Sequence, residues 1–326
     1  MLGSVLITGG SGSFGKAFTR RLLADKLSDR IRIFSRGEHA QESMARELAS
    51  LDPAGNRIRY LVGDIRDANR LAMALRGVDT VIHAAAMKVV PKCEYDPFEA
   101  VKTNILGAQN VIEAALSAGV GKVVALSTDK CVSPANLYGA TKLCAEKLFT
   151  AADVYAGGRD TRFSVVRYGN IAGSQGSVIP LWRSLLAGSN RKIVPVTSPF
   201  CTRYYMTLDE AVQLVFWTLS NMRGGETVIP EMAAYQLSDL AEAMEAKQEI
   251  VGLRPGEKLH EAIVSEHEMH QFRLVGEYWV SGVDANNIGT NMLGKPLVSN
   301  EARRLSVAEI RECLSEQHLL PVRVAA

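Results

Sequence analysis

The stretch Thr8-Gly9-Gly10-Ser11-Gly12-Ser13-Phe14-Gly15 follows a short apolar run, Ser4 to Thr8, and precedes a segment whose apolar residues recur at helical spacing. In such a strand-turn-helix, Gly9 permits a tight turn, Gly12 lets the backbone approach a pyrophosphate, and Gly15 allows close helix packing. The free amides at the helix N-terminus favour an anion. Glycines can also form a purely structural turn, but this context predicts a phosphate cradle that comprises Gly9, Ser11, Gly12, Ser13, Phe14 and Gly15.

Short β-branched runs alternate with helix-like segments through the first half of the chain. Strands are predicted at Ser4 to Thr8, Arg30 to Ser35, Arg57 to Val62, Thr80 to Ala86, Lys122 to Ser127 and Phe163 to Arg167. Long helical stretches are predicted at about residues 97–118 and 138–156. Strand-helix alternation is typical of a parallel sheet with helices on both faces. The sequence therefore predicts an α/β fold with a doubly wound parallel sheet of the Rossmann type.

The regular alternation stops after Tyr168, where loops rich in Gly, Ser and Pro begin, with helices predicted at 178–186 and 208–221. We expect residues 1–170, with about 208–230, to form the cofactor-binding domain. Residues 171–207 and 231–326 are expected to form a smaller α/β domain. Ligands of open parallel sheets lie beyond the carboxyl ends of the strands, so this second unit is predicted to hold the substrate.

The end of the second strand carries information about the cofactor. A carboxylate usually stands there for NAD, whereas a 2′-phosphate needs a cation, so Ser35 and Arg36 favour NADP over NAD. The alternative is that Arg36 is a solvated surface residue. Asp64 and Ile65 end the third strand where the adenine would lie. Small side chains are expected under the cofactor at Ala84, Ala85 and Ala86.

Tyr138 and Lys142 are four residues apart at the start of a predicted helix, so both project from one face. A phenol with a pKa of roughly 10 is a poor base at neutral pH, but a neighbouring ammonium and a cationic nicotinamide ring favour the phenolate. Tyr138 could then take a proton from a substrate hydroxyl while its carbon gives hydride to the nicotinamide. This pair is also common on exposed helices, but the preceding strand and glycine turn favour catalysis.

Together these residues resemble the extended short-chain dehydrogenase/reductase superfamily over nearly the whole chain. The resemblance sharpens at Ser127-Thr128-Asp129-Lys130, because sugar-nucleotide 4,6-dehydratases carry Thr-Asp-Glu or Thr-Asp-Lys there and epimerases of the superfamily lack the couple. Elimination of water needs one group to take the proton at carbon 5 and another to protonate the departing 6-hydroxyl. The resemblance implies catalytic roles for Thr128, Asp129 as the acid and Lys130 as the base.

The Thr-Asp-Lys triplet resembles the inverting UDP-N-acetylglucosamine 4,6-dehydratases, which make an intermediate of pseudaminic acid-type bacterial glycans. Residues 85–91 with 94–97, 136–142 and 252–261 are also similar to that family. The resemblance implies further cofactor contacts from Lys88, Tyr138, Lys142, Tyr168 and Asn170. It implies UDP-sugar contacts from Lys88, Asn170, Val178, Thr202, Arg203, Arg254 and Glu257. For Arg203 and Arg254, the alternative to ligand contact is a structural salt bridge.

Two differences from the family pattern concern specificity. Gly37 and Ala40 stand where relatives commonly carry Asp and Lys, next to the predicted 2′-phosphate site. Ser198 and Cys201 replace an Asp and a Met that are frequent before Thr-Arg, near the predicted sugar pocket. The alternatives that remain are a UDP-N-acetylhexosamine 4-epimerase, a dehydratase for another UDP-sugar and a non-catalytic NADP sensor.

Composition excludes other classes. The formal charge of +2 over 326 residues gives no electrostatic case for nucleic acid or anionic membrane. The chain has five cysteines without a CxxC pair and no apolar run of about 20 residues. We therefore expect a cytoplasmic protein with reduced thiols, an unreactive Cys131 and no metal site at His267 and His270. His83 is expected to be a core histidine, and the resemblance implies a homo-oligomer.

Overall fold

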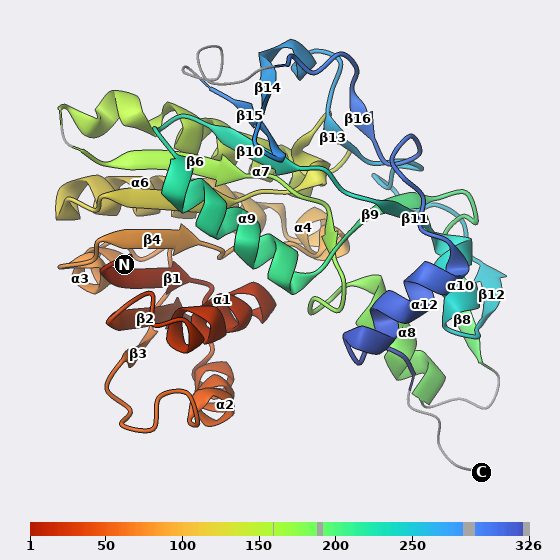
Figure 1. Ribbon diagram of the computed structural model, residues 1–326, viewed down its shortest axis with the longest axis horizontal. Coiled ribbons are helices and arrows are strands. Elements are labelled where there is room, and N and C mark those ends of the chain that lie inside the picture. The colour runs from red at the N-terminus through yellow and green to blue at the C-terminus, as the bar shows by residue number, and fades with distance from the viewer. Residues whose placement is uncertain (159, 188–191, 283–290, 322–326) are drawn as a thin grey trace.

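A computed structural model describes residues 1–158, 160–187, 192–282 and 291–321. Its central feature is a sheet that has nine strands within these ranges, in the order β14-β15-β10-β6-β5-β4-β1-β2-β3 (Figure 1). The first six strands are parallel, and the order reverses between β1 and β4, as a doubly wound sheet requires. Their bounds are β1 Ser4–Thr8, β2 Arg30–Ser35, β3 Ile58–Val62, β4 Thr80–His83, β5 Lys122–Leu126 and β6 Arg162–Val166.

Helices cover both faces of this sheet because its strands are apolar on both sides. Within β1, Val5 and Ile7 belong to one core cluster and Leu6 to another. The first cluster includes residues of α1 (Ser13–Ala24), α2 (Glu38–Leu48) and α9 (Leu208–Asn221). The second includes residues of α3 (Ala68–Leu75), α6 (Gly107–Ala118) and α7 (Leu137–Ala151). The predicted doubly wound α/β architecture is thus confirmed.

Two predicted elements end or break earlier than the apolar pattern suggested. The fourth strand stops at His83, and residues 84–89 form an irregular crossing toward α4 (Val90–Tyr95). The predicted helix over 97–118 consists of α5 (Pro97–Val101), a π-helical segment over 102–106 and α6. Asn104 in that segment points inward, donating through Nδ2 to Met87 O at 2.9 Å. A π segment re-aims side chains that a continuous α-helix would place elsewhere.

The large sheet extends beyond the parallel strands. β10 (Thr227–Pro230) pairs parallel to β6, and β15 (Tyr278–Ser281) then pairs antiparallel to β10. β14 (Phe272–Val275) closes a hairpin with β15 through Gly276, whose φ is +63°. The sequence-based division placed all of 231–326 in the smaller unit, but residues 272–281 belong to the large sheet. The β14–β15 hairpin pairs with the edge of β10 that would otherwise be exposed. Composition alone does not reveal this pairing.

The smaller unit lies beyond the carboxyl ends of the parallel strands, where α8, α10 and α12 group together (Figure 1). Its core surrounds the buried Trp182. The helices are α8 Val178–Ala187, α10 Leu237–Ala243 and α12 Val307–Glu316. The strands are β7 Asn170–Ile171, β8 Ile193–Val196, β9 Thr202–Met206, β11 Ala234–Gln236, β12 Lys247–Ile250, β13 Ala262–Val264 and β16 Leu297–Val298. Within the described ranges, none of the helices could cross a membrane.

Candidate active site

The glycine turn between β1 and α1 has the geometry of a phosphate cradle. Gly9 has φ +64°, and a Cβ there would lie 2.8 Å from the backbone of Ala85. Because Gly12 caps α1 without any side-chain hydrogen bond, the first amides of the helix remain available to an anion. The tight turn against Ala85 and the available helix amides together fit the pyrophosphate of a dinucleotide cofactor.

The second strand ends in a polar edge that extends this cradle. Ser11 Oγ donates to Ser35 Oγ at 2.9 Å, and Gln41 Nε2 donates to the same oxygen at 3.0 Å. Arg36 is exposed, with Nη1 4.0 Å from Asp64 Oδ2. The sequence analysis did not single out Gln41. Its burial on the second α-helix, directly after Ser35 and Arg36, is the signal that could have found it.

Asp64 lies beside this edge in an ion pair with Arg66, whose Nη2 is 2.6 Å from Oδ2. Burial works against the charged carboxylate, but the hydrogen bonds from Arg66 outweigh it and lower the pKa of Asp64. Ile65 is buried and contacts the position of a Gly107 Cβ. Asp64 is therefore a charged residue at the predicted adenine end of the site.

Tyr138, the second residue of α7, is buried. Burial raises the pKa of its phenol to about 12, while the charge of Lys130 and a hydrogen bond with Thr128 act in the opposite direction. Lys142, one turn on, donates from Nζ to Leu126 O at 2.6 Å, and burial lowers its pKa. The charge of Lys130 thus favours the phenolate of Tyr138 in this structure.

His83 is a core residue, as expected. Its Nδ1 bonds Thr8 Oγ1 at 2.8 Å. Burial, aided by the charge of Lys142, lowers the pKa of His83 to about 3. The imidazole is therefore neutral at physiological pH. Among the described residues, no cluster of His, Cys, Asp and Glu could hold a metal ion.

The buried carboxylates of Asp129 and Glu261 flank the partly buried Lys130, and we call these three residues the Lys130 cluster. Lys130 Nζ donates to Asp129 Oδ1 at 3.1 Å and lies 3.5 Å from Glu261 Oε1. Thr128 Oγ1 also donates to Asp129 Oδ1, at 2.9 Å, and Asn170 Oδ1 accepts from Lys130 at 3.2 Å. Asp129 Oδ2 and Glu261 Oε2 are buried without a hydrogen-bond partner among the described residues. The cluster thus has unused acceptors beside the predicted acid and base.

The loop 252–261 brings Glu261 into this cluster. Asn136 Nδ2 donates to Gly256 O at 2.9 Å, and Lys258 Nζ donates to Val132 O at 2.6 Å. A Cβ at Gly256 would lie 2.9 Å from Ala135 O, so the loop lies close against the chain that precedes α7. These contacts fasten the loop to the chain before α7. A generic dinucleotide-binding fold does not require such a loop. Sequence reasoning used the stretch for Arg254 and Glu257 but did not assign a role to its last residue.

The structure brings Arg203 and Glu257 together. Arg203 is buried, with Nη2 2.8 Å from Glu257 Oε1, and its Nη1 donates to Thr202 O at 2.8 Å. Thr202 Oγ1 in turn bonds His260 Nδ1 at 2.8 Å. This is the salt bridge that the sequence analysis weighed against ligand contact for Arg203. Arg254, by contrast, is exposed, and its backbone N–H donates to Glu257.

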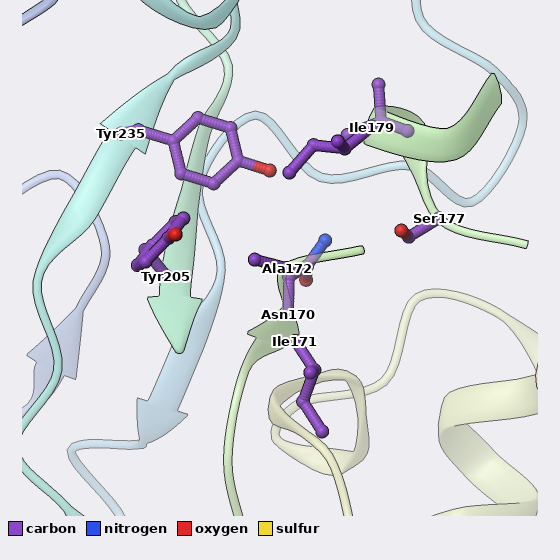
Figure 2. A pocket seen from close by; sticks show the side chains of 8 residues that line it. Asn170, Ile171, Ala172, Ser177, Ile179, Tyr205 and Tyr235 are labelled. Atoms are coloured by element: carbon purple, nitrogen blue, oxygen red, sulfur yellow. The ribbon is translucent and has the colours of Figure 1, made fainter. Parts of the chain in front are cut away.

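A small pocket lies between β7, the start of α8 and the strands β9 and β11. Figure 2 shows Tyr235, Tyr205, Ser177 and Asn170 around it, with the Tyr235 hydroxyl pointing toward Ile179. Val178 also lines this pocket, so Asn170 and Val178, both predicted substrate contacts, meet there. Lys88 is exposed on the irregular crossing after β4, yet desolvation lowers its pKa. Tyr168 is buried at the end of β6, near Tyr138.

The sequence profile of a family described as polysaccharide biosynthesis protein matches residues 5–281. The chain belongs to this family. A relative from Campylobacter jejuni, named UDP-N-acetylglucosamine 4,6-dehydratase (inverting), is 48% identical over 82% of this chain and 79% of its own. A Rickettsia canadensis protein named UDP-glucose 4-epimerase is 38% identical over 95% of each chain.

Solved structures confirm the fold of this polysaccharide biosynthesis protein. The X-ray structure of Pen from Bacillus thuringiensis has a TM-score of 0.90 and 38% identity, covering 97% of this chain and 98% of that one. A dTDP-glucose 4,6-dehydratase from Streptomyces venezuelae, solved with NAD, has a TM-score of 0.69 and 23% identity, covering 97% and 99%. The family match and the 48% identical relative confirm the resemblance that the sequence motifs indicate.

A second charge cluster in the protein, the Arg167 cluster, comprises Glu146, Arg167 and Glu268. Arg167 Nη2 pairs with Glu146, and Nη1 lies 2.8 Å from both Glu268 Oε1 and Ile263 O. Ser127 Oγ donates to Glu146 Oε2 at 2.7 Å, and Cys131 Sγ donates to the same oxygen. Burial and then the charge of Glu146 raise the pKa of Cys131 to about 12. Cys131 is therefore a thiol in a structural network, as expected.

Proposed function

We propose that this polysaccharide biosynthesis protein is an NADP-dependent UDP-N-acetylglucosamine 4,6-dehydratase that inverts carbon 5. The observation that carries the proposal is the Asp129–Lys130 pair, which lies 3.1 Å apart at the carboxyl end of β5 beside Tyr138. Elimination needs one group to take the proton at carbon 5 and another to protonate the departing 6-hydroxyl, whereas epimerisation at carbon 4 loses no water and needs neither of these two groups. The named relative with 48% identity supports the same substrate class.

The cradle of the glycine turn would hold the cofactor, with Ser35 and Arg36 at the 2′-phosphate. When bound, the nicotinamide supplies oxidation at carbon 4 and later returns the same electrons to carbon 6. Arg36 supports NADP because its exposed guanidinium can form charge-assisted hydrogen bonds with a phosphate. The Streptomyces dehydratase was solved with NAD bound. Calorimetry of NAD and NADP binding to the apoprotein distinguishes the two cofactors.

Tyr138 is proposed to take the proton of the 4-hydroxyl. Because burial raises its pKa to about 12, the phenol predominates at neutral pH in this structure. A neighbouring positive charge favours the phenolate, and Lys130 supplies one. Once carbon 4 is a ketone, the proton at carbon 5 becomes acidic, and we propose Lys130 as the base and Asp129 as the acid of the elimination. The face on which carbon 5 regains a proton then sets its configuration.

The UDP moiety is proposed to bind on the smaller unit, near Asn170 and Val178 and the exposed Arg254. Arginine forks suit diphosphate oxygens, since they bond two oxygens at once. Arg203 holds Glu257 instead, so we propose that it shapes the loop 252–261 and contacts the ligand only if that pair opens. A homo-oligomer remains a prediction from the family resemblance, and a cytoplasmic location remains a prediction from composition.

Incubation with UDP-N-acetylglucosamine in deuterated water tests the proposal. The expected product is the 4-keto-6-deoxy sugar with deuterium at an inverted carbon 5, observed by NMR. Tyr138→Phe serves as the matched inactive control and should lose roughly 100- to 10,000-fold in rate. Formation of the 4-epimer alone would favour the epimerase that the Rickettsia relative's name suggests. Equal turnover of UDP-glucose would overturn the 2-acetamido specificity.

A further inference from the structure

Glu261 is the one member of the Lys130 cluster that the proposed reaction has not used. It is 3% exposed, and its Oε1 lies 3.5 Å from Lys130 Nζ. Its Oε2 is buried with no hydrogen-bond partner among the described residues. A buried carboxylate with an unsatisfied oxygen is costly for folding. Such a group is retained where its charge serves the site.

The backbone holds Glu261 firmly in this place. Its N–H donates to Ser299 Oγ at 2.9 Å, and that hydroxyl bonds Thr202 Oγ1 at 2.6 Å. The next residue, Ala262, pairs with Val298 in the β13–β16 ladder. Strand pairing and a hydroxyl network therefore fix the backbone of Glu261 at the place from which its side chain reaches Lys130.

The charges of the cluster set a requirement for the elimination. Burial works against the charge of Lys130, but Asp129 and Glu261 outweigh it and raise the pKa of this lysine. Lys130 therefore starts as an ammonium, beside the Asp129 carboxylate. To act as the base, Lys130 must be a neutral amine, and to act as the acid, Asp129 must be protonated. The ion pair therefore has its proton on the wrong partner for elimination.

We propose that Glu261 is the positioning residue for Lys130, which holds the ammonium beside Asp129 so that one proton passes between these two groups during elimination. The inference rests on the proposed function and deepens it. Glu261 does not need to touch the substrate in this role. It acts through Lys130, because it orients the ammonium group and places a negative charge beside it.

The proton balance closes within the cluster. Lys130 first gives a proton to Asp129 Oδ1, 3.1 Å away, which leaves a neutral amine and a carboxylic acid. The amine then takes the proton from carbon 5, and the acid gives its proton to the 6-hydroxyl oxygen. The C–H bond at carbon 5 and the C–O bond at carbon 6 break, a C=C bond forms, and water leaves. The ammonium and the carboxylate are both restored.

Several other ionisable groups face this cluster. The charge of Arg203 on β9 lowers the pKa of Lys130, in opposition to the two carboxylates. Lys130 in turn acts on the phenols of Tyr138 and Tyr235, and the two carboxylates act on that of Tyr204. Within the described residues, Lys130 thus forms ion pairs with two carboxylates, Asp129 and Glu261. Removing Glu261 should make the lysine lose its proton at lower pH.

The test is the pH dependence of kcat and KM for the 4,6-dehydration of UDP-N-acetylglucosamine. For Glu261→Gln, we expect kcat to fall on the alkaline side at a pH lower than in the parent by about one to three units, the size of an opposite-charge effect at this distance. KM should stay within threefold, because the residue acts through Lys130. Glu261→Asp retains the charge and should restore the alkaline limb toward that of the parent.

Glu268→Gln is the matched control, since Glu268 is a partly buried glutamate of the neighbouring turn that pairs with Arg167 and not with Lys130. Its alkaline limb should superimpose on that of the parent. A superimposable limb in Glu261→Gln would overturn the role of Glu261, as would equal changes in kcat and KM at every pH. The parent separates the two claims: if it makes no 4-keto-6-deoxy sugar, the proposed function itself falls. If the Gln variant does not fold, Glu261→Met, which also removes the charge at similar length, takes its place with the same two outcomes.

Discussion

Two charge clusters connect the first half of the chain to residues 261–268, and each places one cation between two carboxylates. In the Arg167 cluster, the guanidinium spreads its donors over both carboxylates and Ile263 O. In the Lys130 cluster, one oxygen of Asp129 and one of Glu261 remain without a partner among the described residues. Both clusters contain one cation and two carboxylates. All carboxylate oxygens of the Arg167 cluster accept hydrogen bonds, whereas, within the described part of the chain, two of those in the Lys130 cluster do not.

The difference follows from the two cations. Arginine offers five N–H donors in a fixed planar fork, and it stays charged at any physiological pH. Lysine offers three donors on a flexible stem, and its pKa shifts readily when it is buried. A saturated Arg pair suits a structural link, whereas a Lys pair with spare acceptors can move a proton. The comparison predicts that damage to one cluster affects stability and damage to the other affects chemistry.

The largest expected effect is that of Asp129→Asn. The amide keeps the size of the side chain but cannot deliver a proton as a carboxylic acid does, so formation of the 4-keto-6-deoxy product should fall by roughly 100- to 10,000-fold. Product formation is followed by NMR, and folding by circular dichroism. A rate within tenfold of the parent would remove Asp129 from the elimination and would favour the epimerase reading.

Arg167→Met, in the other cluster, should lower stability and leave the rate nearly unchanged. Loss of the guanidinium leaves Glu146 and Glu268 without their cation, so the free energy of unfolding in urea should fall by about 3–5 kcal/mol. The rate of the folded variant, assayed well below its unfolding transition, should stay within tenfold. Arg304→Met is the control, because its pair with Asp239 is largely exposed and is worth at most about 1 kcal/mol. Equal losses for the two variants would erase the contrast between buried and exposed pairs.

Arg36→Ala tests whether cofactor choice is independent of both clusters. Loss of charge-assisted hydrogen bonds to a 2′-phosphate should weaken NADP binding by about 1.5–3 kcal/mol, or roughly 10- to 100-fold. NAD binding, measured by calorimetry on the same apoprotein, should hardly change. Arg46→Ala removes an exposed arginine of α2 that pairs with Glu42 and should leave both affinities as they were. A parallel loss for NAD and NADP would exclude Arg36 from phosphate recognition.

The smallest expected effect concerns Cys131. Because burial and Glu146 raise its pKa to about 12, almost none of it is thiolate at pH 8, and thiolate is the reactive form. Iodoacetamide should therefore modify the exposed Cys144 in the native protein and spare Cys131, as read by peptide mass spectrometry. Cys144→Ser should abolish the early labelling. Modification of Cys131 at the rate of Cys144 would show that the Arg167 cluster opens to solvent.

The parts of this protein that the sequence predicted correctly are those in which the cause is local. The parallel strands and the glycine turn follow from runs of β-branched residues and from a φ that only glycine adopts easily at Gly9. The helix over Leu208–Asn221 was also predicted, and a capping box with Thr207 and Glu210 marks its start. The Asp129–Lys130 pair is adjacent in sequence, so its proximity needed no fold.

Other features depend on tertiary contacts between segments that lie far apart in the sequence. Glu261 reaches Lys130 only because Asn136 and Lys258 fasten the loop 252–261 to the chain before α7. Likewise, residues 272–281 join the large sheet because β10 offers them an edge. Spacing and periodicity describe neighbours along the chain and carry no information on such pairings. Sequence by itself determined the sheet, the phosphate turn and the adjacent acid and base, whereas the tertiary structure alone decided which buried charge controls them.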